Sequence, residues 1–95
     1  MAEATKRALK IIKAMRSATF SGISVTELAQ NLKTSATNIC RDLDDLVSEG
    51  FVEKREDGRY QLSIAMLQLA TSYQTEHNRM TSRLAEINER INRTL

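Results

Sequence analysis

Apolar residues recur every three to four positions in three consecutive stretches of the chain, which is the spacing of amphipathic helices. The first helix is expected over residues 4–16, with its apolar stripe at Ala8, Leu9, Ile11, Ile12 and Met15. Residues 17–23 are rich in Ser, Thr and Gly and are expected to form a loop. Phe20 lies in this loop and is expected to pack into the core.

The second and third helices carry their own start signals. Ser24 and Glu27 form a capping-box pattern ahead of a helix over about residues 25–32. After a short link, Ser35 is a suitable N-cap for a helix over residues 36–48. These two helices and their short connection have the layout of a helix-turn-helix.

A small hairpin is expected next. Residues 51–55 and 60–62 have strand character and flank an Asp-Gly turn, which is a strong hairpin signal. Three helices followed by a two-stranded ribbon give a mostly α fold with a minor β part, the winged helix-turn-helix. In this fold residues 25–48 form the helix-turn-helix and 51–62 form the wing. We expect residues 1–62 to be one domain.

The rest of the chain follows a heptad pattern, which is typical of a coiled coil. The a and d positions are Met66, Ala70, Tyr73, His77, Met80, Leu84, Ile87, Ile91 and Thr94. One helix over residues 64–95 would be about 48 Å long. Weak helix formers leave a break near 74–79 as an alternative. We expect the part from Ile64 to Tyr73 to pack on the first helix.

The remaining apolar stripe needs a partner, and a second copy of the chain is the simplest one. We therefore interpret residues 63–95 as a helical extension that forms a homodimer. The dimerisation residues are expected to be Tyr73, His77, Met80, Leu84, Ile87 and Ile91. Charges at the g positions slightly favour an antiparallel pair, in which Glu76 meets Arg90 around Arg83. His77 is either a tolerated polar residue of the seam or a group that titrates near neutral pH and loosens the dimer in acid.

Composition excludes several classes of function. The 95 residues contain one cysteine and one histidine, so we expect no disulfide, no metal site, no cofactor and no enzyme activity. No apolar run approaches the roughly 20 residues of a membrane span, and the N-terminus does not resemble a secretory signal. We expect a cytoplasmic protein without membrane contact. The net charge is only +2, but five basic residues against one acidic residue gather in residues 1–16.

The stretch "RALKIIKAM … SGISVTELAQNLKTSATNICRDLDDLVSEGFVEKREDGRYQLS" resembles the N-terminal DNA-binding domain of IclR-type transcriptional regulators. The resemblance runs from about Arg7 to Leu62, and "IAMLQLATSY" resembles the linker helix that follows in that family. Individual words are shared with other winged-helix regulators, such as the MarR type. The family's effector domain has no counterpart before Leu95, so no small-molecule effector is expected within this chain. The family tends to have Lys at the position of Ala36 and an apolar residue at that of Asp42.

The resemblance implies binding of double-stranded DNA, with helix 36–48 in the major groove and the wing, residues 54–59, on the backbone. Asn38 suits adenine, Arg41 suits guanine and Thr37 suits a thymine methyl or a phosphate. The lysines of the first helix form either a row of phosphate contacts or a solvated face. A polar first turn is also ordinary capping. The expected contact residues are Lys6, Lys10, Thr26, Ser35, Ala36, Thr37, Asn38, Arg41, Lys54, Arg55 and Arg59.

Two features of the third helix need their own interpretation. Its acidic residues, Asp42, Asp44, Asp45 and Glu49, would repel phosphate, so we expect them to point along the flank or away from DNA, with Asp42 able to pair with a basic residue. Cys40 is expected to be a small, partly buried thiol, and a redox switch is the weaker alternative.

The leading hypothesis is a small dimeric, sequence-specific regulator of transcription. One alternative is a protein-interaction or assembly module, in a phage for example, because winged-helix folds also serve as adaptors. Another is a nonspecific architectural DNA binder, whose affinity would follow salt but not sequence.

Overall fold

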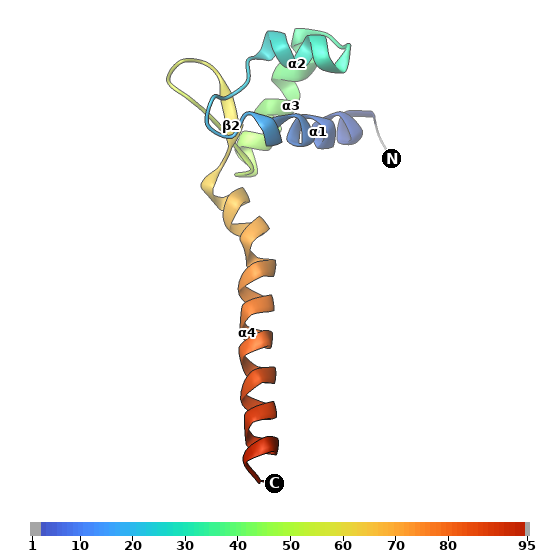
Figure 1. Cartoon of the computed structure of the whole chain (residues 1–95). Coiled ribbons are helices and arrows are strands. Elements are labelled where there is room, and N and C mark those ends of the chain that lie inside the picture. The colour runs from blue at the N-terminus through green and yellow to red at the C-terminus, as the bar shows by residue number, and fades with distance from the viewer. Residues whose placement is uncertain (1–2, 95) are drawn as a thin grey trace.

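The computed structural model describes residues 3–94, so the outermost positions of the two expected domains (1, 2 and 95) lie outside the described residues. The elements in order are α1 (Glu3–Ala14), a 3₁₀ turn (Met15–Ser17), α2 (Val25–Leu32), α3 (Ala36–Ser48), β1 (Val52–Lys54), β2 (Tyr60–Leu62) and α4 (Ile64–Thr94). Figure 1 shows a small head, residues 3–63, from which α4 projects as a stalk. The radius of gyration is 19.8 Å, against about 12 Å for a compact chain of this length.

Both helices of the helix-turn-helix begin at the serines that the sequence predicts. The Ser24 hydroxyl accepts from the backbone N–H of Glu27 at 3.1 Å, and the Glu27 carboxylate accepts from the N–H of Ser24 at 3.3 Å. The Ser35 hydroxyl accepts from the N–H of Asn38 at 3.1 Å. Each bond satisfies a backbone donor that has no partner within its helix.

The wing is a two-stranded antiparallel sheet in which Val52 pairs with Leu62 and Lys54 with Tyr60. Tyr60 also exchanges two backbone hydrogen bonds of 2.8 Å with Ile23, so the loop before α2 adds a short third edge to the wing. The expected strand over 51–55 is shortened to 52–54, and the return strand has the expected bounds.

The core lies where α1, α2, α3 and the sheet meet. Its fully enclosed side chains are Ile11, Met15, Leu28, Ile39 and Leu43. The expectation that Phe20 joins this core is wrong, because its side chain is 91% exposed. Ala18 and Ile23, on either side of it in sequence, fill the space beneath the loop instead.

The stalk is one continuous helix from Ile64 to Thr94, without the alternative break near 74–79. It begins at buried Ser63, whose hydroxyl accepts from the N–H of Met66 at 3.0 Å and donates to the carbonyl of Gly50 at 2.5 Å. The expected packing of residues 64–73 on the first helix is wrong. Ile64, Leu69 and Tyr73 are 67%, 59% and 72% exposed, because the chain turns away from the head at Ser63.

Candidate nucleic-acid interface

Helix α3 offers one face to the core and the opposite face to solvent. Its buried side chains lie at Ile39, Asp42, Leu43 and Leu46. At 100° per residue, the centre of the opposite face is occupied by Thr37, Arg41 and Asp44, all of which are exposed. Arg41 forms no ion pair within residues 3–94. The first two turns of this face are thus accessible, and a carboxylate follows them.

The polar residues around the start of α3 differ in solvent exposure and in hydrogen bonding. Ser35, Ala36 and Thr37 are exposed, and so is Thr26 in the first turn of α2. Asn38 is half-buried, and its side-chain amide donates to the Thr34 hydroxyl at 3.1 Å. That bond holds the Asn38 side chain in one orientation and uses one of its donors.

Asp42 is buried and faces the core, away from the exposed face of α3. Asp44 does not lie on the flank as expected, because it shares the centre of the exposed face with Thr37 and Arg41. The Arg7 guanidinium of α1 donates to both carboxylate oxygens of Asp42, once at 3.1 Å through Nη2. The expected pairing of Asp42 with a basic residue is therefore confirmed. The hydrogen bond with Asp42 raises the pKa of the Arg7 guanidinium above its ordinary value. This pair fixes α1 against α3.

Arg7 is the partner that sequence reasoning did not name. The signal was present, since Asp42 occupies a core-facing position of the helical pattern, and a buried carboxylate requires a cation. Cys40, by contrast, is exposed, so the expectation of a partly buried thiol is wrong. Its position lies on the flank of the exposed face, away from the buried stripe.

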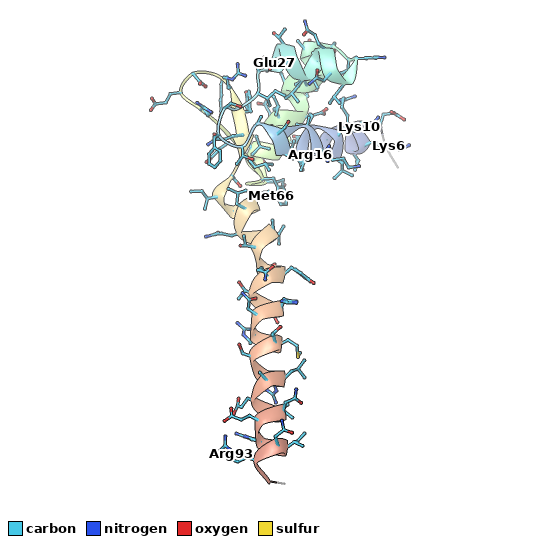
Figure 2. All side chains as sticks on the ribbon, viewed as in Figure 1. Lys6, Lys10, Arg16, Glu27, Met66 and Arg93 are labelled. Atoms are coloured by element: carbon cyan, nitrogen blue, oxygen red, sulfur yellow. The ribbon has the colours of Figure 1, made fainter. Side chains whose placement is uncertain are left out.

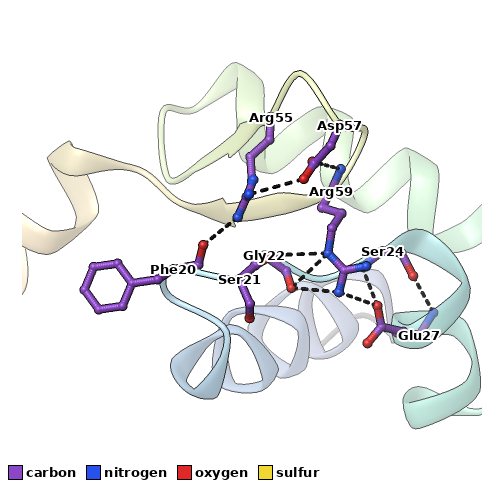
Figure 3. A network of polar contacts seen from close by, with 8 residues as sticks. All are labelled: Phe20, Ser21, Gly22, Ser24, Glu27, Arg55, Asp57 and Arg59. Atoms are coloured by element: carbon purple, nitrogen blue, oxygen red, sulfur yellow. Dashed lines mark hydrogen bonds and ion pairs between the residues drawn. The ribbon is translucent and has the colours of Figure 1, made fainter.

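The two arginines of the wing, Arg55 and Arg59, form hydrogen bonds and ion pairs with other residues of the head (Figure 3). Arg55 donates to the Phe20 carbonyl at 2.6 Å and pairs with Asp57 at 3.2 Å. Arg59 donates to the carbonyls of Ser21 and Gly22, each at 3.1 Å. These bonds tie the wing to the loop before α2, so the wing has a defined position relative to α3.

Arg59 also connects the wing to α2 through Glu27, at 2.7 Å. The hydrogen bonds from Ser24 and the nearby Arg59 charge lower the pKa of Glu27 below its ordinary value. The capping box and the wing therefore share one carboxylate. The third cation of the wing, Lys54, is exposed, with its ammonium 5.9 Å from the centre of the Tyr60 ring.

The predicted dimerisation residues all lie along the exposed stalk. Tyr73, Met80, Leu84, Ile87 and Ile91 are between 42% and 72% exposed. His77 is exposed as well, and its ring centre lies 6.0 Å from that of Tyr73. Of the eleven large apolar side chains that are exposed in the described residues, eight belong to α4. None of the helices described here has the length and apolar character needed to cross a bilayer.

Comparison with known proteins assigns the chain to a family. The family model HVO_A0114 matches residues 3–66, which include the head and the first residues of the stalk. The chain belongs to the HVO_A0114 family. No curated protein matches the chain in sequence.

Two solved structures resemble this HVO_A0114 member. Pseudomonas aeruginosa HmgR matches with a TM-score of 0.69 at 20% identity, over 88% of this chain and 36% of that chain. A point mutant of S. aureus MepR matches with a TM-score of 0.51 at 15% identity, over 100% of this chain and 75% of that chain. They are winged-helix regulators of the IclR and MarR types respectively. At these identities the likeness establishes the winged-helix fold alone, and it does not single out the IclR type.

Proposed function

We propose that this protein binds double-stranded DNA in a sequence-specific manner and regulates transcription, with α3 in the major groove. The observation that carries the proposal is the exposed first half of α3, where Arg41 and Thr37 share one face and Arg41 has no ion pair within the described residues. An arginine on such a face can donate two parallel hydrogen bonds to guanine. The IclR-like sequence and the two structural neighbours are consistent with this function.

The acidic residues define how far the contact extends. Asp44 lies one turn beyond Arg41 on the same exposed face. Its charge opposes an approach of phosphates to the second half of the helix. We therefore propose that base contacts come from Ser35, Ala36, Thr37, Asn38 and Arg41, within the first two turns. Thr26 then serves a flanking phosphate from the start of α2.

In this proposal the wing has two kinds of cation. Lys54 is free to reach the DNA backbone as a flexible point charge. Arg55 and Arg59 act mainly by holding the wing, because their guanidinium groups are bonded to the loop before α2 and to Glu27. Any contact that these arginines make with DNA comes in addition to those bonds.

We further propose that two copies pair through α4. An isolated helix gains too little from its own hydrogen bonds to remain folded, unless it buries an apolar face. The five exposed apolar residues of the seam are each about half accessible, and burying ten of them in a dimer contributes on the order of 10 kcal/mol. Association costs about 4–15 kcal/mol. The dimer is therefore expected to depend on protein concentration, and DNA with two half-sites would stabilise it.

Fluorescence anisotropy with a mixed-sequence duplex at two salt concentrations tests DNA binding. A specific site can then be selected from random DNA. The Arg41→Ala protein should lose about 1–3 kcal/mol of affinity for that site and discriminate less at one base pair. Arg79→Ala is the matched control, because it removes the same charge from the outer side of the stalk. Equal affinities for Arg41→Ala and the control would refute the recognition role of α3.

Sedimentation equilibrium tests the dimer. Leu84→Asp places a charge in the proposed seam and should yield monomers, whereas Ala85→Asp makes a similar change on the outer side and should not.

A specific observation favours a second function, a protein-assembly module: the carboxylate of Asp44 shares the exposed face of α3, and most exposed apolar residues of the described chain lie on α4. Dimer formation without any DNA binding at low salt would favour that alternative.

A further inference from the structure

A polar groove of about 210 Å³ lies between α1 and the turn that joins α2 to α3. Its polar lining residues are Glu3, Lys6, Arg7, Lys10, Lys33 and Thr34. Figure 2 shows Lys6 and Lys10 on α1 in the head, far from Arg93 at the tip of the stalk. The groove thus brings the lysines of α1 together with a residue of the helix-turn-helix turn that the sequence analysis did not select.

The groove carries a net positive charge. Four of its lining side chains are cationic and one, Glu3, is anionic. The Arg7 charge is balanced by Asp42 behind it. Lys6, Lys10 and Lys33 form no ion pair within the described part of the chain. Three positive charges against one negative charge leave a balance of +2 that faces solvent.

Lys33 occupies an unusual backbone conformation. Its φ of 54° and ψ of 49° place it in the left-handed region, where it closes the C-terminus of α2. Glycine or asparagine usually fills such a position, because other side chains are strained there. Among residues 3–94, Lys33 is the one non-glycine residue with positive φ. A lysine at this position makes the turn less stable than a glycine would, and it contributes a cation to the groove.

The groove also adjoins the start of the recognition helix. Thr34 is a lining residue, and its hydroxyl accepts from the side chain of Asn38 at 3.1 Å. The Arg7–Asp42 pair holds the α1 wall of the groove against α3. An anion in the groove would therefore have a fixed position relative to Thr37 and Arg41, which follow in the first two turns.

We propose that this groove is a seat for one backbone phosphate of DNA, next to the base pairs that α3 contacts. The ligand is a phosphodiester, which the ammonium groups of Lys10 and Lys33 would flank and the Thr34 hydroxyl would hydrogen-bond. This inference rests on the proposed function, because it assigns a second contact to the same bound duplex. The seat fixes the position of α3 along the major groove and carries no information on base sequence.

The test measures the salt dependence of DNA affinity for Lys33→Gly, Lys10→Ala and the double variant. Lys33→Gly suits the left-handed backbone, so the variant is expected to fold. One lost phosphate contact lowers the slope of log K against log salt by about 0.9. It also weakens binding about eightfold at 0.1 M salt relative to 1 M. Lys13→Ala removes the same charge from α1 outside the groove and should change the slope much less.

The double variant separates one shared phosphate from two independent contacts. A single seat predicts that Lys33→Gly and Lys10→Ala together lower the slope little more than either one alone. The decrease should be the same on the specific site and on mixed-sequence DNA, because a phosphate contact does not read base sequence. If the double variant lowers the slope by twice the amount of either single variant, the two lysines contact two separate phosphates, and the seat is overturned. Unchanged slopes in a protein that binds DNA would overturn the seat and leave the proposed function intact.

Two further outcomes remain informative. If the unsubstituted protein binds no DNA, both proposals fail together. Replacing chloride by inorganic phosphate at constant ionic strength should weaken DNA binding, because the free anion competes with the DNA phosphate for the groove, and this competition should be lost in Lys33→Gly. Competition that is equally strong in Lys33→Gly would show that no DNA phosphate occupies the groove and would overturn the seat.

Discussion

Gly22 lies in the loop before α2, beside the side chains of Arg55 and Arg59 of the wing. Its φ is +71°, and a methyl group added there would lie 3.0 Å from both Arg55 Cδ and Arg59 Cβ. Gly58, at the tip of the wing, has a similar φ of +85° but no atom within 4 Å of such a methyl group. The two glycines therefore separate the cost of the backbone conformation from the cost of crowding.

The expected magnitudes follow from these two environments. An alanine in the left-handed region costs about 1–2 kcal/mol, so Gly58→Ala should lower the free energy of unfolding by that amount. Gly22→Ala adds contacts well inside the favourable carbon–carbon distance of about 3.5–4.0 Å. Arg55 and Arg59 must then move and weaken bonds that contribute about 0.5–1.5 kcal/mol each. We expect Gly22→Ala to cost about 1–2 kcal/mol more than Gly58→Ala.

Urea denaturation measures both variants. The chain has no tryptophan and two tyrosines, so a Tyr73→Phe background leaves buried Tyr60 as a fluorescence reporter of the head. The gain from restricting the unfolded chain is the same for both Gly→Ala changes and cancels in their difference. Equal midpoints for the two variants would refute the reasoning, because they would show that the arginines yield without cost.

Two other predictions concern ion pairs of the head. The pKa of Glu27 is lowered in the folded state, so its contribution to stability is present above its ordinary pKa of 4.5 and is lost as pH falls through the folded value. Glu27→Gln should therefore flatten the acid limb of a stability–pH profile, and an unchanged limb would count against the Ser24 and Arg59 interactions. Arg7→Met should destabilise the head because it leaves the buried carboxylate of Asp42 without its cation. The double variant Arg7→Met/Asp42→Leu should recover most of the lost midpoint in thermal unfolding, and no recovery would indicate another role for Arg7.

The helix-turn-helix could be predicted closely because its signals are local. Ser24 and Ser35 act on backbone donors three residues away, and the observed bounds of α2 and α3 match the expected ones. The capping bonds and the apolar periodicity indicate the same elements. Local signals of this kind are contained in a short window of sequence, so they require no knowledge of the tertiary fold.

The position of Phe20 and the wing network could not be predicted in the same way. A single apolar residue in a loop has no periodicity to show which way it points, and its carbonyl is in fact bonded to Arg55, 35 residues later. Arg59 similarly bonds to backbone carbonyls 37 and 38 residues away. Backbone acceptors have no signature in sequence. Arg55 and Arg59 therefore look like free wing cations until the fold brings the loop beside them.

The stalk shows the same division between local pattern and tertiary contact. The heptad spacing indicates a long helix, and α4 is one. The charges that favoured an antiparallel dimer have partners within the helix: Glu76 pairs with Arg79 at 3.0 Å, and Arg90 with Glu86 at 3.0 Å. Their use inside one helix weakens the preference for an antiparallel pair, so in the proposed dimer the apolar residues of α4 would decide the orientation.

If two copies bind DNA as proposed, the spacing of the half-sites provides an independent constraint on that orientation. The stalk of 31 residues is about 46 Å long. An antiparallel pair along its full length would place the two heads at opposite ends, farther apart than the roughly 34 Å between major grooves one helical turn apart. A parallel pair would place both heads at one end, within reach of adjacent grooves. A selected site with half-sites one turn apart would therefore imply a parallel stalk, and a spacing of two turns an antiparallel one.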